Sequence, residues 1–479
     1  MKLSWSAVGM SAGAALLLPW LGCATVPAGG PSVVAVVVEP RVVAQVRPEF
    51  LSVSLDISQV VGGRFWGAGG GVELGAGETP VPAFDFQRPE LLERARALAP
   101  AYLRIGGTEA DTTWYALDRP PPTPLPPHFT AALTAERWES LVRFSTASRL
   151  PLLFTLAAGP GVRGSLGEWL PAQASELLRH AKRRQDPVVL WELGSEVNAY
   201  PVMHGPAGRV SGREYARDLQ TARDLLDAHF PDAALAGPTS AYWPVIGEPF
   251  PVLRSTLRHA RGALGVVSWH YYPQQSRRCP VAVRRAGLEV MLRPEHLAEI
   301  ERWATEVVQA RDRFEPGAEL WMTETGNAQC GGEPGVSSRF VSSLWWMDQL
   351  GRLARRNHQV VVRQTLVGSD YGLLDPETLR PRPDYHASLL WKQHINVGSK
   401  AAQVTVEGVA GSELTVVSAA RLDSEEILIH PTPPGIAAAM RGSSRWTVPA
   451  QSYAFLRLDD RLSGWVAPEG VAPRQAPGR

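Results

Sequence analysis

The sequence predicts an α/β protein: a (β/α)8 barrel of the TIM type, followed by a C-terminal β-sandwich. Between Phe50 and His394, short apolar runs alternate with longer amphipathic runs, which is the pattern of parallel strands connected by helices. After Val397 this alternation gives way to short β-rich runs separated by turn residues, as expected of a sandwich. The chain of 479 residues exceeds the ~250–300 residues at which single cores stop growing, so we expect two domains.

The barrel is predicted element by element from these runs. The predicted strands are Phe50–Leu55, Ala101–Ile105, Pro151–Thr155, Val188–Leu193, Ala233–Ala236, Val266–His270, Glu319–Thr323 and Val360–Leu366. The predicted helices are Arg88–Leu98, Glu136–Ser148, Ala172–Arg184, Gly212–Ala228, Glu295–Ala310, Ser337–Asn357 and Asp384–His394. The Pro-rich stretch Arg119–Pro127 is expected to be an exposed loop.

Further β-rich runs lie on both sides of the barrel. Before it, two such runs flank Pro40, and we expect this segment, 32–47, to belong to the β-domain rather than to the barrel. After it, the sandwich is predicted from Ala402–Glu407, Ser412–Ala419, Glu426–Ile429, Arg445–Val448 and Ser452–Leu458. The chain therefore divides into a barrel at 48–395, a β-sandwich at 396–465 and a tail at 466–479.

The N-terminus has the pattern of an export signal. Lys2 precedes the apolar stretch Val8–Leu21, which has the length of a signal-peptide core and is too short to span a membrane. Gly22-Cys23 resembles a bacterial lipoprotein cleavage box, in which Cys23 would carry the lipid, although Trp20 stands where that box usually has an aliphatic residue. An ordinary secretory signal is the alternative. In both cases residues 1–23 direct export, to the cell envelope or beyond it.

Cysteine usage and net charge narrow the class of protein further. Besides Cys23, the chain has Cys279 and Cys330; both follow predicted barrel strands and so lie on one rim, where an oxidising compartment lets them pair or leaves two separate thiols. Lys+Arg 48 and Asp+Glu 47 give a net charge of +1. The chain thus lacks the basic excess typical of nucleic-acid-binding proteins.

Function in a barrel of this type resides where the strands end. Glu196 and Glu324 each stand just past a strongly apolar run, and carboxylates at the mouth of a dry barrel are costly unless they are paired or used. Retaining glycosidases need such a pair, one to protonate the leaving oxygen and one to attack the anomeric carbon. The alternative is that each glutamate pairs with an arginine of the rim.

Several segments together resemble one family. The segment Trp191–Asn198 is similar to the acid/base segment of the clan of barrel glycosidases with glutamates on strands 4 and 7. Other segments resemble one family of this clan more specifically, glycoside hydrolase family 79, which is the heparanase and β-glucuronidase family. These segments are Tyr102–Thr108, Trp269–Tyr272, Thr323–Thr325 with Gly331-Gly332, Val362–Gln364 and Pro383–Leu390.

The resemblance implies a role for each matching residue. Glu196 matches the acid/base and Glu324 the nucleophile. The positions that match sugar-binding residues are Asp56, Thr108 and Gln364. The groups that match those binding the uronic carboxylate are the amides around Gly331 and the side chain of Tyr371. His270 or Tyr271 would orient the nucleophile. Two positions depart from the pattern: Ser195 replaces the usual Asn, whose amide holds the sugar 2-hydroxyl, and Val197 replaces the usual Pro. These departures put rate and substrate preference in doubt more than the reaction class.

The resulting hypothesis is a retaining hydrolase that cleaves β-linked glucuronic acid, without metal or cofactor, as a monomer that binds no nucleic acid and meets a membrane only through a lipid on Cys23. Two alternatives remain: a clan relative acting on a neutral β-glycoside, and a surface lipoprotein that binds glycans without cleaving them. The near-neutral charge argues mildly against a long sulfated substrate, which favours a basic cleft.

Overall fold

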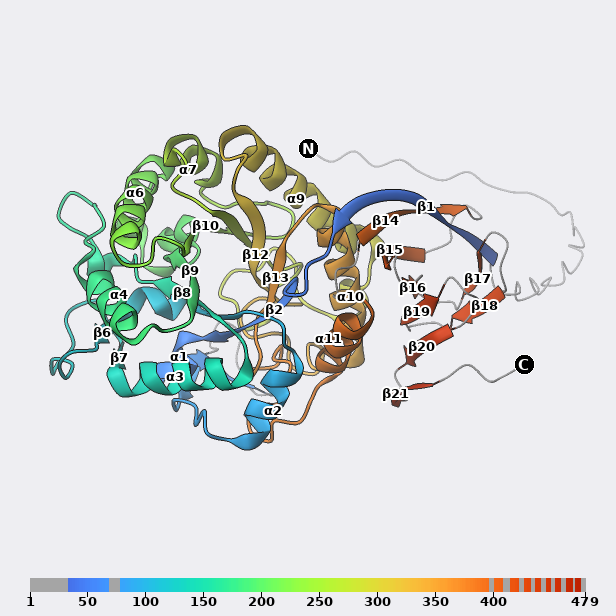
Figure 1. Ribbon diagram of the computed structural model, residues 1–479, viewed down its shortest axis with the longest axis horizontal. Coiled ribbons are helices and arrows are strands. Elements are labelled where there is room, and N and C mark those ends of the chain that lie inside the picture. The colour runs from blue at the N-terminus through green and yellow to red at the C-terminus, as the bar shows by residue number, and fades with distance from the viewer. Residues whose placement is uncertain are drawn as a thin grey trace, which may run out of the picture.

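The computed structural model describes residues 33–68 and 78–395, together with the strands between residues 400 and 474 (Figure 1). The predicted signal peptide at 1–23, with Cys23, lies outside the described residues, so export and lipidation stay predictions. None of the helices among the described residues combines the length and apolarity needed to cross a lipid bilayer.

Eight parallel strands close into a barrel in the order of the chain, which confirms the predicted α/β barrel. They are β2 (Leu51–Asp56), β5 (Leu103–Gly106), β8 (Leu152–Leu156), β9 (Val188–Leu193), β10 (Ala234–Tyr242), β11 (Val266–Tyr271), β12 (Glu319–Thr325) and β13 (Val360–Arg363). Closure is made by β13 and β2, where Val361 pairs with Leu51. Each strand overlaps one of the predicted runs.

Helices cover the outside of the barrel. The larger ones are α2 (Pro89–Ala97), α3 (Ala135–Ser148), α4 (Ala172–Arg184), α6 (Gly212–His229), α7 (Leu253–Ala260), α9 (Pro294–Phe314), α10 (Phe340–Arg355) and α11 (Pro383–His394). The sequence analysis did not predict α7, which has 8 residues and no side-chain cap at Val252. Strand β10 also runs further than predicted. The predicted run ended at Ala236, whereas the strand continues through Gly237-Pro238 to Tyr242, with a register shift after Pro238.

Alternate residues of the strands face either the helices or the barrel interior. Leu153 and Leu190 belong to a separate small apolar cluster with Val266 and Val360, whereas Leu152 and Trp191 belong to the main core. Two residues further along these strands the interior becomes polar, since Thr155 and Glu192 follow Leu153 and Leu190 on the same face. The barrel is therefore filled with apolar side chains below and with polar ones toward its carboxyl end.

The segment before the barrel pairs with strands that follow it. Strand β1 (Val33–Gln45) is antiparallel to β14 (Lys400–Glu407) and parallel to β17 (Ile436–Met440), and the long blue strand lies among the red ones in Figure 1. One sheet is β14-β1-β17-β18 (Arg445–Val448), and a second consists of β15 (Leu414–Arg421), β16 (Glu426–Pro431), β19 (Tyr453–Arg457), β20 (Leu462–Ala467) and β21 (Gly470–Arg474). Strand β21 falls where a tail was expected, and the β-sandwich stays a prediction.

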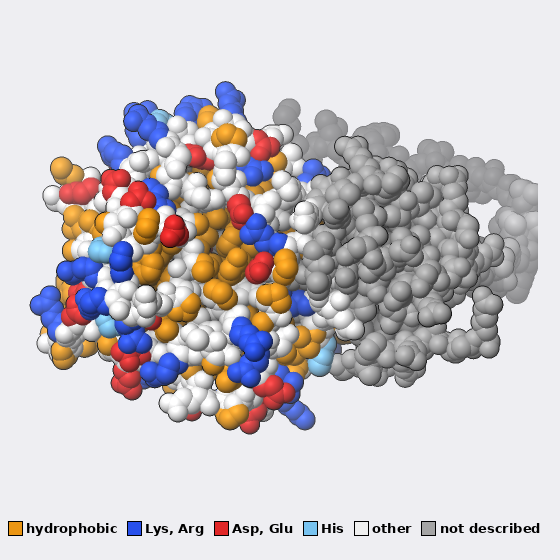
Figure 2. Space-filling model, in the orientation of Figure 1, with side chains coloured by type: hydrophobic (Ala, Val, Ile, Leu, Met, Phe, Trp, Pro, Cys, Tyr) orange, Lys and Arg blue, Asp and Glu red, His pale blue; other side chains and the backbone are white. Residues whose placement is uncertain are grey.

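Short elements are inserted between the barrel strands and helices. After β2 come α1 (Ile57–Val61) and the antiparallel pair β3 (Gly63–Trp66) and β4 (Glu78–Val81); β6 (Thr113–Ala116) and β7 (Ala131–Thr134) form a parallel pair after β5. The Pro-rich loop between β6 and β7 contains no helix or strand. On the face shown in Figure 2, acidic and basic side chains are interspersed around the barrel and apolar ones gather toward its middle.

The structure joins Cys279 and Cys330 in a disulfide. It ties the loop after β11 to the loop after β12, and an ion pair between Arg277 and Glu333 connects the same two loops. The two cysteines are separated by 51 residues, a span that includes α9 and all of β12. Two loops of the barrel rim are thus held to each other by a covalent bond.

Replacing Cys279 and Cys330 together by alanine is expected to lower the free energy of unfolding by ~2–4 kcal/mol, because the open chain gains conformational freedom in the unfolded state. Denaturant titration of the variant and of the wild type measures the loss. A reducing agent should lower the wild-type midpoint and leave that of the variant unchanged. Equal midpoints for the oxidised wild type and the variant would contradict a stabilising bond.

Candidate active site

A cavity of about 500 Å³ opens at the carboxyl ends of the barrel strands. Its wall includes six of the residues singled out from the sequence: Asp56, Thr108, Glu196, Glu324, Gln364 and Tyr371. They come from the ends of different strands, far apart in sequence, and the closure of the barrel brings them together. This is the face on which barrel enzymes carry their active sites.

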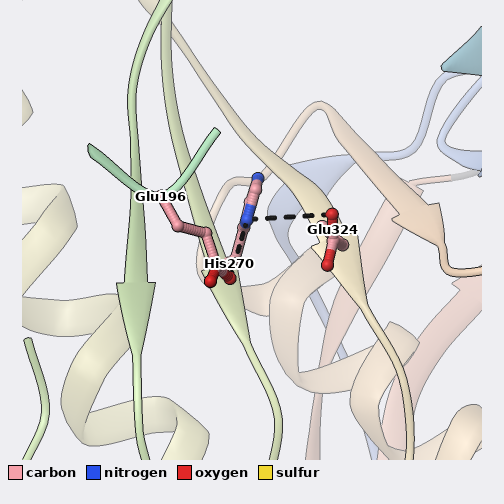
Figure 3. Close-up of side chains that lie close together, drawn as sticks. All are labelled: Glu196, His270 and Glu324. Carbon is pink, nitrogen blue, oxygen red and sulfur yellow. Dashed lines mark hydrogen bonds and ion pairs between the residues drawn. The ribbon is translucent and has the colours of Figure 1, made fainter. Parts of the chain in front are cut away.

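The two glutamates of the prediction lie at the carboxyl ends of the fourth and seventh barrel strands: Glu196 follows β9, and Glu324 is near the end of β12. Both are buried, with 7% of Glu196 and 8% of Glu324 exposed. One carboxylate oxygen of each lies within 4.8 Å of the other, with His270 between them (Figure 3). Retaining glycosidases hold their carboxyl groups about 5–5.5 Å apart and inverting ones about 6.5–9.5 Å, so oxygens this close fit the retaining range better than the inverting one.

Glu324 is held by two donors. Tyr272 donates its hydroxyl to Oε1 at 2.7 Å, and Arg104 donates from a guanidinium nitrogen to Oε2 at 2.8 Å. Burial acts to raise the pKa of Glu324, but His270, Arg104 and Tyr272 together hold it below its usual value. The side chain is therefore a buried carboxylate that stays ionised, as a nucleophile requires.

Arg104 connects Glu324 to the polar layer inside the barrel. Its side chain is fully buried, and it donates to Glu192 at 2.7 Å as well as to Glu324. Thr155 donates to the same Glu192 oxygen at 2.8 Å. An arginine buried between two carboxylates keeps both charges paired in a dry interior. Neither Arg104 nor Glu192 was among the predicted site residues, although both stand inside quoted motifs.

Glu196 lies in a turn after β9 with a different environment. Its backbone is left-handed (φ 54°), a conformation that non-glycine residues seldom adopt, and this turn places the carboxylate beside His270. The distance from His270 Nδ1 to Glu196 Oε1 is 3.2 Å, and His270 Nε2 lies 3.2 Å from the Thr323 hydroxyl. His270 is buried and does not line the cavity, so it contacts Glu196 from the protein interior.

Ser195 does not line the cavity either. Its amide donates to Asp111 at 3.1 Å, and its hydroxyl has no hydrogen-bond partner among the described residues. Burial raises the pKa of Asp111 to about 6, against the donors that lower it. The structure thus shows Ser195 fixing the turn through its backbone, with a free hydroxyl one residue before Glu196.

Asp56 has a structural and an active-site role at once. Its Oδ1 accepts from the amide of Ser58 at 2.9 Å and caps α1, while its side chain also lines the cavity. Burial raises the pKa of Asp56 to about 7, although the donors of Ser58 oppose this. Gly107 must lack a side chain here, because a Cβ atom on it would overlap Asp56 Oδ2.

The structure corrects the prediction for Tyr271. Its hydroxyl donates to Glu299 at 3.1 Å, outside the cavity, whereas the next residue, Tyr272, reaches Glu324. The reason is the alternation of side chains along β11, which turns His270 inward and Tyr271 outward. Applied past the end of the strand, the same period of two could have selected Tyr272 from the sequence.

The remaining predicted residues build the side of the cavity formed by the loops after β12 and β13. Gln364 donates to the Tyr371 hydroxyl at 3.4 Å, and Phe65 packs against both Tyr371 and Tyr272. Gly331 does not line the cavity, although its neighbour Cys330 does. Its φ is 79°, and a Cβ atom on it would overlap Trp66 Cβ, so glycine is required where β3 crosses this loop.

Thr108 lines the cavity beside Met203, at 3.5 Å from its sulfur.

Glu196, His270 and Glu324 are also the group of side chains, among the described residues, whose atoms could surround a cation. Both oxygens of Glu324 already accept from proton donors, however. The donor set therefore suits a carboxylate held for attack on carbon.

A barrel with buried, paired glutamates at the carboxyl ends of its fourth and seventh strands is the arrangement of a glycoside hydrolase, and comparison with known proteins agrees. The model of glycosyl hydrolase family 79, N-terminal domain, matches residues 76–351, which is more than half of the chain. The chain belongs to glycoside hydrolase family 79, as the motifs indicated.

Relatives of similar sequence carry heparanase names. Heparanase-like protein 1 of Arabidopsis thaliana is 29% identical over 342 residues, which cover 68% of this chain and 61% of that protein. Heparanase of Gallus gallus is 29% identical over 417 residues, covering 76% and 72%. Inactive heparanase-2 of Homo sapiens is 27% identical over 281 residues, covering 58% and 44%. The alignment thus spans less than two thirds of the Arabidopsis protein.

Solved structures show the same fold at low identity. A family 51 arabinofuranosidase from Xanthomonas axonopodis pv. citri superposes with a TM-score of 0.62 at 12% identity, covering 86% of this chain and 88% of that one. A 4-O-α-L-rhamnosyl-β-D-glucuronidase from Fusarium oxysporum gives a TM-score of 0.55 at 14% identity, covering 86% and 85%. At such identities the likeness concerns the fold alone.

Replacing Tyr272 by phenylalanine removes a donor that lowers the pKa of Glu324. The pKa of Glu324 then rises, so the acidic limb of kcat/KM should move to higher pH by about 1–2 units, the equivalent of one hydrogen bond to a charged group. The pH profile on a hydrolysed aryl glycoside measures the shift. Tyr271→Phe, which removes a hydroxyl outside the cavity, is the control; a limb that moves equally in both variants would contradict the assignment.

Proposed function

We propose that the protein is a retaining glycosidase that cleaves β-linked glucuronic acid, with Glu324 as nucleophile and Glu196 as general acid and base. The observation that carries this proposal is the pair of buried carboxylates within 4.8 Å, of which only Glu324 is held by Arg104 and Tyr272. Two nearby carboxylates in unlike environments are what a two-step displacement needs.

In the first step, a Glu324 oxygen attacks the anomeric carbon and the bond to the leaving oxygen breaks as that oxygen takes the proton of Glu196. The products are a glycosyl ester on Glu324, a free aglycone and an ionised Glu196. In the second step, Glu196 removes a proton from water, and the resulting oxygen attacks the same carbon and displaces Glu324. Each step inverts the carbon, so the configuration is retained overall.

Neutral donors near the nucleophile support a uronic acid as the sugar. Gln364 and Tyr371 line the cavity next to Tyr272, and amide and phenol groups can bind a carboxylate without the competing salt bridge of a lysine. Family 79 membership supports the same substrate. A neutral sugar in this position remains the alternative.

The charges of the cavity wall argue against a heavily sulfated chain. Basic side chains are scarce among its described residues: Arg64 is the one arginine, beside the acidic residues Asp56, Glu78 and Glu109 and the catalytic pair. Burial raises the pKa of Asp56 to about 7 and also raises the pKa of Glu109. Arg64 already donates to the carbonyl of Glu78 at 2.7 Å. A polyanion is bound most strongly where basic residues predominate, so we propose a substrate with few negative charges beyond its uronic acid.

The purified protein is expected to hydrolyse an aryl β-glucuronide at least about tenfold faster, in kcat/KM, than the matching β-glucoside. A site built to hold a polar group of the substrate rejects the analogue that lacks it. Preference for the glucoside would point instead to the neutral-glycoside alternative. Binding of either sugar without any turnover would support the non-catalytic alternative.

The replacement Glu324→Gln should reduce this hydrolysis by ~10³-fold or more, since the amide cannot form the glycosyl ester. Glu306→Gln is the matched control, because Glu306 is a half-exposed glutamate of α9 outside the cavity wall and should leave kcat/KM unchanged. Substantial turnover by the Glu324 variant would remove this residue from the nucleophile role.

A further inference from the structure

The part of the cavity wall next to the general acid is apolar. Glu196 is followed by a 3-10 turn (Val197–Ala199) and by α5 (Tyr200–Met203), and Ala199, Val202 and Met203 from these elements all line the cavity. Trp243, just after β10, lines it as well. Val202 is 45% exposed, which is high for an aliphatic residue placed at an active site.

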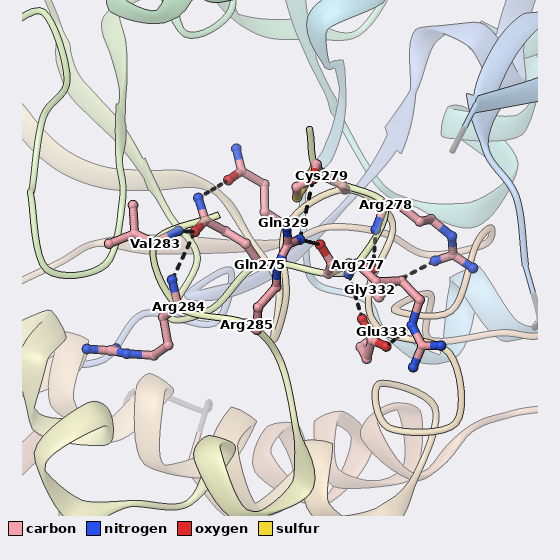
Figure 4. Close-up of a disulfide and its surroundings, with 12 residues drawn as sticks. Gln275, Arg277, Arg278, Cys279, Val283, Arg284, Arg285, Gln329, Gly332 and Glu333 are labelled. Carbon is pink, nitrogen blue, oxygen red and sulfur yellow. Dashed lines mark hydrogen bonds and ion pairs between the residues drawn. A yellow bond between two sulfur atoms is a disulfide. The ribbon is translucent and has the colours of Figure 1, made fainter. Parts of the chain in front are cut away.

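The disulfide loop completes this apolar wall. Pro280 and Val281 follow Cys279 and line the same cavity, and Val281 is 52% exposed. The loop is nevertheless fixed: besides the disulfide, Gln275 bonds to the backbone of Val283 at 2.5 Å and of Arg284 at 2.8 Å (Figure 4). An exposed valine on an anchored loop is a preformed contact surface rather than a fluctuating one.

Polar residues lie near Glu324 in the same cavity. Tyr272 donates to Glu324, and Asp56, Gln364 and Tyr371 line the cavity with it, so the sugar carbon that Glu324 attacks lies among these groups. The leaving oxygen must lie within hydrogen-bond reach of Glu196. Whatever departs with that oxygen is therefore next to the segment that follows Glu196, and so against the apolar wall.

We infer that the apolar wall is the subsite for the leaving group, and that the substrates are β-glucuronides of uncharged alcohols with an apolar, aromatic face. This inference rests on the proposed function and adds the class of aglycone to it. Exposed aliphatic side chains grouped at a concave site indicate an apolar ligand. Glu78 also lines the cavity, and a carboxylate there disfavours an aglycone with a negative charge.

Three substrates with the same sugar test the proposed function and the inferred class of aglycone separately. β-Glucuronyl fluoride has no aglycone and reports on the sugar subsite alone. Two aryl β-glucuronides with phenols of matched acidity, one uncharged and one bearing a carboxylate, report on the apolar wall. For the wild type, kcat/KM is expected to be at least about tenfold higher for the uncharged aryl substrate than for the carboxylated one, which is the discrimination that a small apolar group achieves in a hydrophobic pocket.

The double replacement Val202→Ser with Val281→Ser should lower the ratio of kcat/KM for the uncharged aryl substrate to that for the fluoride by about tenfold. Turnover of the fluoride shows that the variant is folded. Leu166→Ser is the matched control, because Leu166 is 88% exposed on the loop after β8 and does not line the cavity; its ratio should equal that of the wild type.

The outcomes are distinguishable. Hydrolysis of the fluoride with equal kcat/KM for the two aryl substrates, or with a ratio unaffected by the serine replacements, would overturn the inference and leave the proposed function intact. Absence of hydrolysis of all three glucuronides would contradict the proposed function, and this inference with it.

Discussion

The contact between Arg104 and Glu324 is the interaction on which the site depends. A fully buried arginine is tolerable only when carboxylates neutralise it, and Arg104 has two, Glu192 below and Glu324 above. Together with His270 and Tyr272, the same contact opposes the effect of burial on the pKa of Glu324 and holds it below its usual value, in a barrel mouth that would otherwise favour the neutral form. Arg104 therefore connects the polar layer inside the barrel directly to the glutamate at its rim.

The two glutamates differ because the protein holds them differently. Glu324 extends from a regular strand into a set of fixed donors, whereas Glu196 is presented by a left-handed turn next to His270. The backbone amide of Ser195 donates to Asp111 and so holds that turn in place. Because this contact involves the backbone, it does not depend on which side chain stands at position 195. The turn that carries Glu196 is thus fixed by a contact that does not involve the Ser195 side chain.

Much of the barrel could be predicted because its strands are nearly continuous apolar runs, and the strand ends alone selected both glutamates and Asp56. What failed depended on details that the apolar runs alone do not carry. The predicted strand ended at Ala236, whereas β10 continues through Gly237-Pro238 to Tyr242. Tyr271 was named where the period of two along β11, extended past its end, indicates Tyr272. Arg104 was overlooked because its meaning comes only from Glu192 and Glu324, which lie 88 and 220 residues away.

The most direct test of the two-carboxylate account is the configuration of the first sugar released. Proton NMR of an aryl β-glucuronide digest, recorded before the anomers equilibrate, distinguishes the two outcomes. The account predicts that the β-anomer of the free sugar forms first and the α-anomer grows in later by mutarotation. Initial appearance of the α-anomer would mean a single inverting displacement and would contradict a nucleophilic Glu324.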